Sequence, residues 1–99
     1  MTVPVVAIFR VKAGHEDTVE AMFRSVIDTT LAEEGCIAYQ LNRDNADPAR
    51  FIWTEEWESL ELLEKHLAAP HITELFARVP EFIESSDVVK LTPVAGGKA

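Results

Sequence analysis

Two histidines five positions apart, His66 and His71, are the side chains of this sequence best suited to proton transfer near neutral pH. An uncharged imidazole accepts a proton from a weak acid when its pKa lies near the pH of the reaction. His66 precedes Leu67, a predicted core residue of a helix, so it belongs near the margin between that helix and a sheet. It is a candidate base, although a structural histidine bonded to a backbone carbonyl fits the same position. His71 follows Pro70 in the first turn of the next helix, where it can bind a substrate or simply close the turn.

Aromatic side chains are concentrated in segment 51–57. Trp53 and Trp57 are separated by four positions, so in an extended strand they project from the same face as Phe51 and Glu55. One face of this strand is expected to line a pocket and the other to meet a second sheet, and the sequence does not distinguish between them. Packing in the hydrophobic core is the alternative role for each of these aromatic residues.

The other candidates for substrate binding are a hydroxyl, a carboxylate and one more aromatic ring. Tyr39, on a neighbouring strand, has a hydroxyl that can hydrogen-bond a substrate oxygen or a buried carbonyl. Glu56 lies in a strand that should be central, where unpaired charge is costly, so it needs either a function or a pair with Arg10 or Lys12. Phe76 is expected on the inward side of a short helix. The candidate substrate-binding residues are Tyr39, Trp53, Trp57, His71, Phe76 and Glu56.

The charge balance excludes several classes of partner. The 99 residues include 9 Lys and Arg against 17 Asp and Glu, a formal charge of −8, which repels phosphate backbones and anionic lipid surfaces. Neither nucleic acid nor a membrane is expected as a partner, and no apolar run approaches the roughly 20 residues that span a bilayer. The beginning of the sequence lacks the basic and apolar regions of a signal peptide, so a cytoplasmic location is expected.

Metal and cysteine chemistry are not expected either. Cys36 is the only cysteine, so the chain has no internal disulfide, and no histidine or cation lies near it in sequence to activate the thiol. One cysteine and three scattered histidines, His15, His66 and His71, do not have the spacing of a metal-binding motif. We therefore predict no metal site and no cofactor, and interpret Cys36 as a small buried residue.

Hydrophobic periodicity predicts a single domain of alternating strands and helices. Residues 3–12 have apolar side chains on both faces of a strand. Residues 16–31 repeat apolar positions at three- and four-residue spacing, which predicts one amphipathic helix. The other predicted elements are strands at 36–42, 51–57 and 88–92, a turn at 44–48, helices that begin near 59 and 70, a helical turn at 82–83 and a flexible tail at 94–99. The domain is expected to span residues 1–93.

The end of the predicted helix 16–31 has one unexplained feature. Gly35 suits the left-handed conformation that ends a helix. Glu33 and Glu34, however, lie at the negative end of the helix dipole, where acidic side chains are unfavourable. The sequence offers no physical reason for this placement.

The order of elements, βαββαβ, predicts a ferredoxin-like α+β fold. A hairpin and a right-handed crossover place the four strands in one antiparallel sheet with the helices on a single face. The other face would expose the second set of apolar side chains of strand 3–12 to water. A second copy of the sheet, related by a two-fold axis, would cover that face. We therefore expect a homodimer of the dimeric α/β barrel type.

The sequence also resembles a known family over nearly its whole length. The motifs that carry the resemblance are Glu33-Glu34-Gly35-Cys36 with Tyr39, then Phe51 and Glu55-Glu56-Trp57, and finally the run from His66 to His71. In this order and spacing they resemble the antibiotic-biosynthesis-monooxygenase domain family, and within it the quinol monooxygenase branch. The resemblance implies oxygenation of anthrones or hydroquinones by dioxygen without a cofactor, in which the deprotonated substrate itself gives electrons to oxygen.

The implied reaction makes three demands on the protein: a base, donors that hold an oxyanion, and an apolar pocket that excludes water. With the family resemblance, His66 becomes the predicted catalytic base. Two alternatives stay open. One is an isomerase or degradative enzyme for a small signalling molecule, whose pocket would need clustered Arg or Lys if the molecule is phosphorylated. The other is a non-catalytic dimer that binds a small ligand, which a pocket filled by the protein's own Trp and Phe side chains would favour.

One branch of the same superfamily degrades haem, with an asparagine on the first strand, a tryptophan on the second helix and a downstream histidine. The corresponding residues here are Ala7, His66 and Phe76. None of them has the required type, so haem degradation is not expected.

Overall fold

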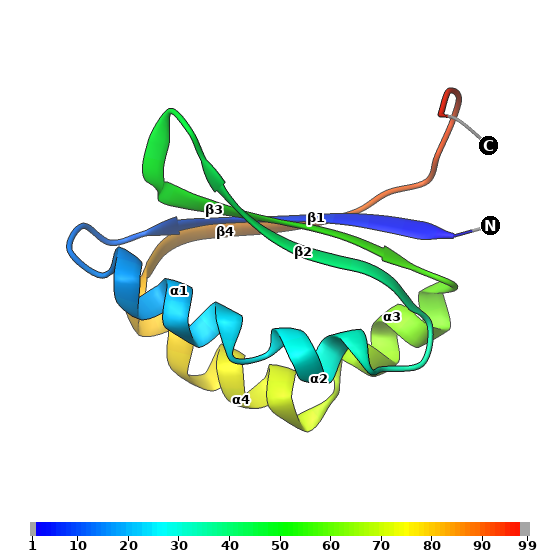
Figure 1. Cartoon of the computed structure of the whole chain (residues 1–99), viewed down its shortest axis with the longest axis horizontal. Coiled ribbons are helices and arrows are strands. Elements are labelled where there is room, and N and C mark those ends of the chain that lie inside the picture. The colour runs from blue at the N-terminus through cyan, green and yellow to red at the C-terminus, as the bar shows by residue number, and fades with distance from the viewer. Residues whose placement is uncertain (1, 98–99) are drawn as a thin grey trace.

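A computed structural model describes residues 2–97 as a four-stranded antiparallel sheet with helices packed on one face (Figure 1). The elements in chain order are β1 (Val3–Val11), α1 (Glu16–Arg24), α2 (Ile27–Leu31), β2 (Cys36–Asp44), β3 (Asp47–Trp57), α3 (Leu60–Leu67), α4 (Pro70–Arg78), the 3₁₀ helix η1 (Val79–Phe82) and β4 (Ile83–Lys90). The strands lie in the order β2-β3-β1-β4. The predicted ferredoxin-like α+β fold is confirmed. Within residues 2–97, no helix is long and apolar enough to cross a membrane.

Alternating side chains of β1 and β3 explain why the helices cover one face of the sheet. In Val5–Val11 the odd-numbered residues are buried and the even-numbered ones are partly exposed. In β3, Phe51, Trp53 and Trp57 are buried on the same side, and Phe51 lies opposite Phe9 in the β1–β3 pair. The two tryptophans therefore point toward the helices, which decides the direction that the sequence left open.

Phe23 of α1 is the centre of the aromatic core. Its ring centroid lies 5.1 Å from that of Phe9, 5.4 Å from that of Trp53 and 6.0 Å from that of Phe51, with edge-to-face geometry in each pair. Such contacts stabilise aromatic pairs beyond the effect of burial alone. This cluster holds α1 against the two central strands, so it fixes the position of the chain that follows α1.

The predicted helix 16–31 is interrupted at Ser25 and Val26, so its prediction as one helix was wrong. The Ser25 hydroxyl donates to the carbonyl oxygen of Met22 at 2.6 Å, a local bond that competes with regular helix hydrogen bonding. Val26 and Thr30 are both buried, so the apolar spacing continues across the break. Periodicity alone therefore did not reveal the interruption.

The hairpin between β2 and β3 is tighter than the predicted turn at 44–48. β2 continues to Asp44 and β3 already begins at Asp47. The Asp44 carboxylate accepts a hydrogen bond from the backbone N–H of Ala46 at 2.8 Å and pairs with Arg50 at 3.1 Å. These contacts close the turn locally, which allows strand pairing to extend almost to its tip.

The last strand, β4, spans Ile83–Lys90, and its predicted range of 88–92 was wrong. Residues 84–87 are polar and exposed, so they carry no apolar pattern that would predict a strand. Backbone pairing with β1, in which Ile83 lies opposite Val11, defines the strand instead. Residues 91–97 continue without helix or strand, and the last two residues of the predicted tail, 98 and 99, lie outside the described residues.

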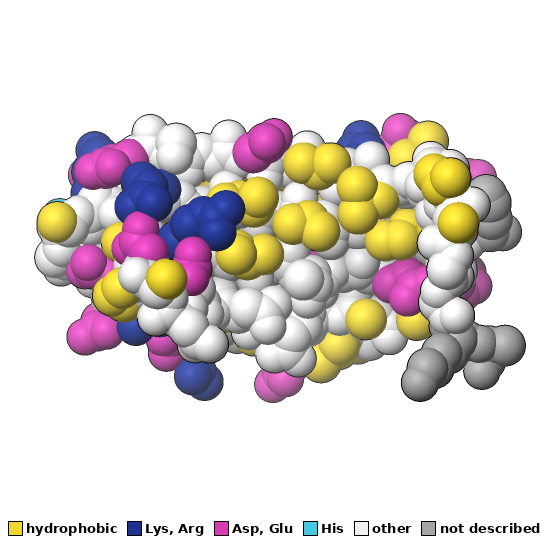
Figure 2. Space-filling view, turned by 90° about the horizontal axis from the view of Figure 1, so that it is seen from above, with side chains coloured by type: hydrophobic (Ala, Val, Ile, Leu, Met, Phe, Trp, Pro, Cys, Tyr) yellow, Lys and Arg dark blue, Asp and Glu magenta, His cyan; other side chains and the backbone are white. Residues whose placement is uncertain are grey.

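The face of the sheet opposite the helices is uncovered and apolar near its centre. Figure 2 looks onto this face and shows apolar side chains gathered over the sheet. Ile8 lies opposite Ile52 in the β1–β3 pair, and Val6 lies opposite Val89 in the β1–β4 pair. All four side chains are at least partly exposed in the single chain. The predicted homodimer would cover this face, and it stays a prediction.

Replacing Gly35 with alanine should destabilise the fold far more than the same change at Gly14. Both glycines have positive φ, +86° and +87°, a conformation that costs other residues roughly 1–2 kcal/mol. A Cβ on Gly35 would also lie 2.5 Å from Cδ1 of Leu62, whereas a Cβ on Gly14 meets nothing within 4 Å. The added clash should cost about a further 1–3 kcal/mol. Urea unfolding of both variants measures the difference, and equal losses would show that α3 adjusts freely around Leu62.

Candidate functional site

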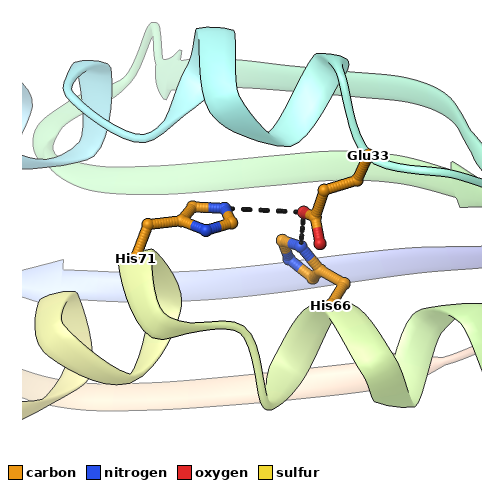
Figure 3. Close-up of side chains that lie close together, drawn as sticks. All are labelled: Glu33, His66 and His71. Carbon is orange, nitrogen blue, oxygen red and sulfur yellow. Dashed lines mark hydrogen bonds and ion pairs between the residues drawn. The ribbon is translucent and has the colours of Figure 1, made fainter.

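Glu33, His66 and His71 meet beside the end of α2, the last turn of α3 and the first turn of α4 (Figure 3). Nδ1 of His66 lies 2.6 Å from Oε2 of Glu33, and Nε2 of His71 lies 3.5 Å from the same oxygen. The Thr30 hydroxyl oxygen is 3.0 Å from Nε2 of His71. The structure thus brings the two predicted histidines together with a glutamate to which the sequence gave no role.

The pairing with His66 explains why Glu33 follows the C-terminus of a helix. The Glu33 backbone N–H donates to the carbonyl oxygen of Thr30 at 3.0 Å, which keeps the residue at the end of α2. A negative charge there costs about 0.3–1 kcal/mol. A hydrogen bond to a charged group contributes about 1.5–3 kcal/mol, and the carboxylate accepts one from His66. The tertiary contact therefore offsets the unfavourable local placement.

His66 is an enclosed imidazole with a fixed orientation. It is 2% exposed, and its ring centroid lies 4.5 Å from that of Trp57 and 5.4 Å from that of Tyr39. Burial lowers the pKa of His66 from its usual 6.5, and the hydrogen bond and charge of Glu33 oppose part of that shift. Because an ionised carboxylate only accepts hydrogen bonds, Nδ1 carries the hydrogen and Nε2 keeps a lone pair. This is the arrangement that orients a histidine base.

Tyr39 supplies a hydroxyl beside the same histidine. Its ring stacks on Trp53 with centroids 4.4 Å apart. Burial raises the pKa of Tyr39 and the negative charge of Glu55 raises it further, while a hydrogen bond with Thr30 acts in the opposite direction. The phenol is therefore protonated at neutral pH and is a hydrogen-bond donor.

A small cavity of about 30 Å³ lies between the sheet and the helices α3 and α4. Its walls include Tyr39, Trp53, Glu55, His66, Phe76 and Val88. Sites for small molecules usually have about 300–1,000 Å³, so an aromatic substrate requires the cavity to widen. Phe76 is 41% exposed and Val88 is 46% exposed. These two side chains form the part of the wall that can move at the lowest cost in packing.

Trp57, a predicted substrate-binding residue, packs against the ring of His66 and is not part of the cavity wall. It is completely buried, and its Nε1 donates a hydrogen bond to Oε1 of Glu55 at 3.0 Å. Trp57 therefore supports the position of His66 and the orientation of the Glu55 carboxyl.

Glu56 projects from the opposite face of the sheet, away from His66. It accepts a hydrogen bond from the Thr2 hydroxyl. Its predicted pairing with Arg10 or Lys12 was wrong, because Arg10 pairs with Asp47 at 2.7 Å. The early start of β3 brings Asp47 to that position. The structure therefore does not include Glu56 in the site around the cavity.

His71 faces a second hollow on the surface. This pocket of about 180 Å³ is lined by His71 of α4 together with Met22 and Val26 near the end of α1. His71 is not part of the cavity wall that contains His66. It lies between the buried histidine and this surface pocket, in contact with both Glu33 and Thr30.

Cys36 is only partly buried, in contrast to the prediction. Burial raises the pKa of its thiol, and the charges of Glu33 and Glu55 raise it further. The residue is therefore a protonated thiol at neutral pH and not a reactive thiolate.

The sequence did not indicate a functional role for three residues of the site: Thr30, Glu33 and Glu55. The signal for Glu33 was its unfavourable place after a helix, since a charge that opposes the dipole needs a partner elsewhere. The signal for Glu55 was its shared strand parity with Trp53 and Trp57, which placed a carboxyl on an aromatic face. Thr30 gave no separate signal, because it occupies an ordinary inward position of the helical repeat.

Replacing Glu55 with glutamine should raise the melting temperature by a few degrees at pH 7.5, and this gain should disappear near pH 4. Burial raises the pKa of Glu55 above 4.5, the hydrogen bond from Trp57 lowers it, and the charge of Glu33 raises it. A carboxyl with a raised folded-state pKa stabilises the fold below pH 4.5 and loses that contribution as the pH rises through the folded value. Glutamine is uncharged and still accepts from Trp57. Melting curves at both pH values test this, with Glu56→Gln as the control, and a gain that does not depend on pH would contradict it.

The comparisons with known proteins agree with this fold. The family model for antibiotic biosynthesis monooxygenase matches residues 2–78. Over 78 residues the chain is 35% identical to YgiN of Escherichia coli, named as a probable quinol monooxygenase, covering 69% of this chain and 75% of YgiN. It is 23% identical over 86 residues to the uncharacterized protein sll1783 of Synechocystis, covering 87% of this chain but only 58% of that relative.

The solved structure of Rv0793 from Mycobacterium tuberculosis matches over 99% of this chain and all of its own length. The TM-score is 0.91 and the sequence identity is 25%. The match therefore includes every helix and strand that surrounds Glu33, His66 and His71. With most of its length matched by the family model and its fold shared in full, this chain belongs to the antibiotic biosynthesis monooxygenase family.

Proposed function

We propose that this chain is a cofactor-independent monooxygenase that oxidises a small aromatic hydroquinone or anthrone-like substrate with dioxygen. Membership of the family, and a relative named as a quinol monooxygenase, support an oxidoreductase-like enzyme at the family level. The observation that carries the finer proposal is the arrangement of His66. Its Nδ1 is bonded to Glu33, and its ring forms part of the wall of a largely apolar cavity beside Tyr39.

The first chemical step is removal of a proton from the substrate hydroxyl or enol by Nε2 of His66. Burial lowers the pKa of His66, so the imidazole is uncharged and ready to accept that proton. Glu33 stabilises the imidazolium that results, because its carboxylate stays hydrogen-bonded to Nδ1. The protonated Tyr39, which lines the same cavity, would exchange its hydrogen bond with Thr30 for one to the substrate oxyanion.

The electrons for the oxygenation come from the deprotonated substrate. An electron-rich oxyanion gives an electron to dioxygen, and the two radicals then combine at carbon. In an anthrone-like substrate a CH₂ group becomes a C=O group, and the second oxygen atom leaves as water with the two hydrogens. Apolar walls such as Trp53 and Phe76 exclude bulk water from the intermediates.

We also propose that the working unit is a homodimer. The supporting observation is the exposed apolar face formed by Val6, Ile8, Ile52 and Val89, together with the exposed edge strand β4. A monomer rarely leaves such a face in water. A two-fold pairing of these faces forms the predicted barrel, with residues 1–93 as the domain and 94–99 as its tail.

The non-catalytic alternative is supported by the size of the cavity. Its volume of about 30 Å³ holds little more than one water molecule, and rings of the protein itself occupy the space beside it. An enzyme for a phosphorylated signalling molecule has less support, because the cavity lining contains no Lys or Arg among the described residues.

Oxygen consumption with metal-free protein tests the proposed function. The substrates are a panel of reduced quinols and anthrones, and the spontaneous oxidation rate is subtracted for each. A saturable rate supports the monooxygenase. A flat response across the panel, with a ligand-induced rise in melting temperature, would support the non-catalytic binding dimer instead.

A further inference from the structure

We propose that Glu33, His66 and His71 also form a binding site for a divalent transition-metal ion such as Zn²⁺. The bound ion would prevent His66 from accepting the substrate proton. The regulatory part rests on the proposed function. The metal site itself does not, since it depends only on the three side chains.

The three ligand atoms are already close to the spacing that a metal ion needs. Oε2 of Glu33, Nδ1 of His66 and Nε2 of His71 lie within 4.8 Å of one another, with individual distances of 2.6 Å and 3.5 Å from the carboxylate oxygen. Bonds of about 2.0–2.2 Å to a common ion place ligand atoms roughly 3.0–3.5 Å apart. The Glu33–His66 pair must therefore open slightly, while the Glu33–His71 distance of 3.5 Å already suits a common ion.

The chemistry of the three groups selects the class of ion. Two imidazoles and one carboxylate suit Zn²⁺, Fe²⁺ and similar ions, whereas Ca²⁺ and Mg²⁺ prefer sites made only of oxygen atoms. Three protein ligands also leave at least one coordination position for water. The ligands come from three separate elements, which explains why their sequence spacing did not resemble a metal motif.

The cluster has a route to solvent. The side chains of Glu33 and His71 are 18% and 19% exposed, while that of His66 is only 3% exposed. His71 also lines the surface pocket of about 180 Å³ beside the end of α1. An ion can therefore reach His71 and Glu33 first and His66 last. Thr30, whose hydroxyl lies 3.0 Å from Nε2 of His71, must give up that contact.

Metal binding and proton transfer require different states of the same imidazole. In the metal-free site Nδ1 carries the hydrogen and donates it to Glu33, so Nε2 is the base. An ion on Nδ1 replaces that hydrogen, and a neutral imidazole then carries its hydrogen on Nε2. His66 can no longer accept a proton at the cavity, so the bound ion inhibits oxygenation.

Titration of the metal-free protein with Zn²⁺ by calorimetry tests the site directly, and Co²⁺ provides a visible absorption spectrum that reports its ligands. We expect one ion per chain, with binding at least about tenfold weaker in Glu33→Gln and in His71→Ala, each of which loses one ligand. His15→Ala is the matched control, because His15 packs beside Phe82, outside the cluster. Equal affinity in all four proteins, or no binding to the wild type, would overturn the site.

Oxygen uptake by the wild type, with and without one equivalent of Zn²⁺, tests the regulatory part. We expect at least a tenfold loss of rate that a chelator restores, and the same response in His15→Ala. Bound Zn²⁺ with an unchanged rate would overturn the switch. If the metal-free protein consumes no oxygen, the proposed function fails and the regulatory part with it, whereas the titration still decides the metal site.

Discussion

Replacing His66 with asparagine should lower kcat/KM for oxygen uptake by about 10²–10⁴-fold, the usual contribution of a positioned general base. The side chain of asparagine places an N–H donor near the position of Nδ1, so the bond to Glu33 can be retained. It has no atom that corresponds to Nε2. The variant therefore removes the basic atom while it preserves most of the local structure.

Alanine is a poorer choice at this position, because His66 is 2% exposed and packs on the ring of Trp57. Truncation would leave a cavity and destabilise the fold whatever the function of the residue. The melting temperature and oligomeric state of His66→Asn serve as controls. Both should remain close to those of the wild type.

Substrate acidity distinguishes a base from a residue that only shapes the pocket. If His66 removes the substrate proton, its loss should matter less for halogenated quinols, whose hydroxyl groups are more acidic and need less assistance. The ratio of wild-type to His66→Asn rates across such a series is the measurement. A ratio that does not change with acidity would mean that His66 is not the base.

Replacing Ile8 with lysine should convert the proposed dimer to a monomer without loss of fold. Ile8 lies at the centre of the uncovered face, opposite Ile52 on one side and Asp87 on the other. Removing an ammonium group from water between two sheets costs several kcal/mol of desolvation free energy, even beside a carboxylate, so dimerisation should weaken by at least about 100-fold. Within one chain the lysine has a favourable cross-strand neighbour in Asp87.

Light scattering of the protein as it elutes from a size-exclusion column measures its oligomeric state. A thermal melt measures whether the fold is retained. The control is Leu31→Lys, which places the same charge on α2, on the helical side of the sheet, at a residue that is 52% exposed. That variant should remain dimeric. If Ile8→Lys also remains dimeric, the open sheet face is not the interface and the predicted barrel is wrong.

The local patterns of the sequence were sufficient for the architecture. Strand parity placed Phe51, Trp53 and Trp57 on one face, and the structure buries all three there. Helical spacing identified Val19, Phe23, Val26 and Thr30 as inward residues, whereas Leu31, in the same repeat, is 52% exposed. These predictions succeeded because side-chain direction in a strand or helix depends only on the backbone of that element.

The boundaries that failed are those defined by backbone hydrogen bonds that leave no mark in the side-chain pattern. Strand β4 starts at Ile83 because its backbone pairs with β1, although residues 84–87 have no strand-like pattern. At the break after Arg24, the backbone N–H of Val26 donates to the carbonyl oxygen of Phe23 at 3.4 Å, an i−3 partner that the apolar repeat does not register. In both cases a hydrogen-bond partner decides the structure, while the side-chain pattern does not.

The sequence by itself determined the fold class, the side chains of segment 51–57 that share one face, and two histidines able to handle a proton. Only the tertiary structure decided that Glu33 holds His66, that His71 shares the same carboxylate, and that Glu56 lies on the other side of the sheet. The reason is physical. Periodicity fixes directions within one element, but a distance of 2.6 Å between residues 33 positions apart depends on how α2 and α3 pack against the sheet.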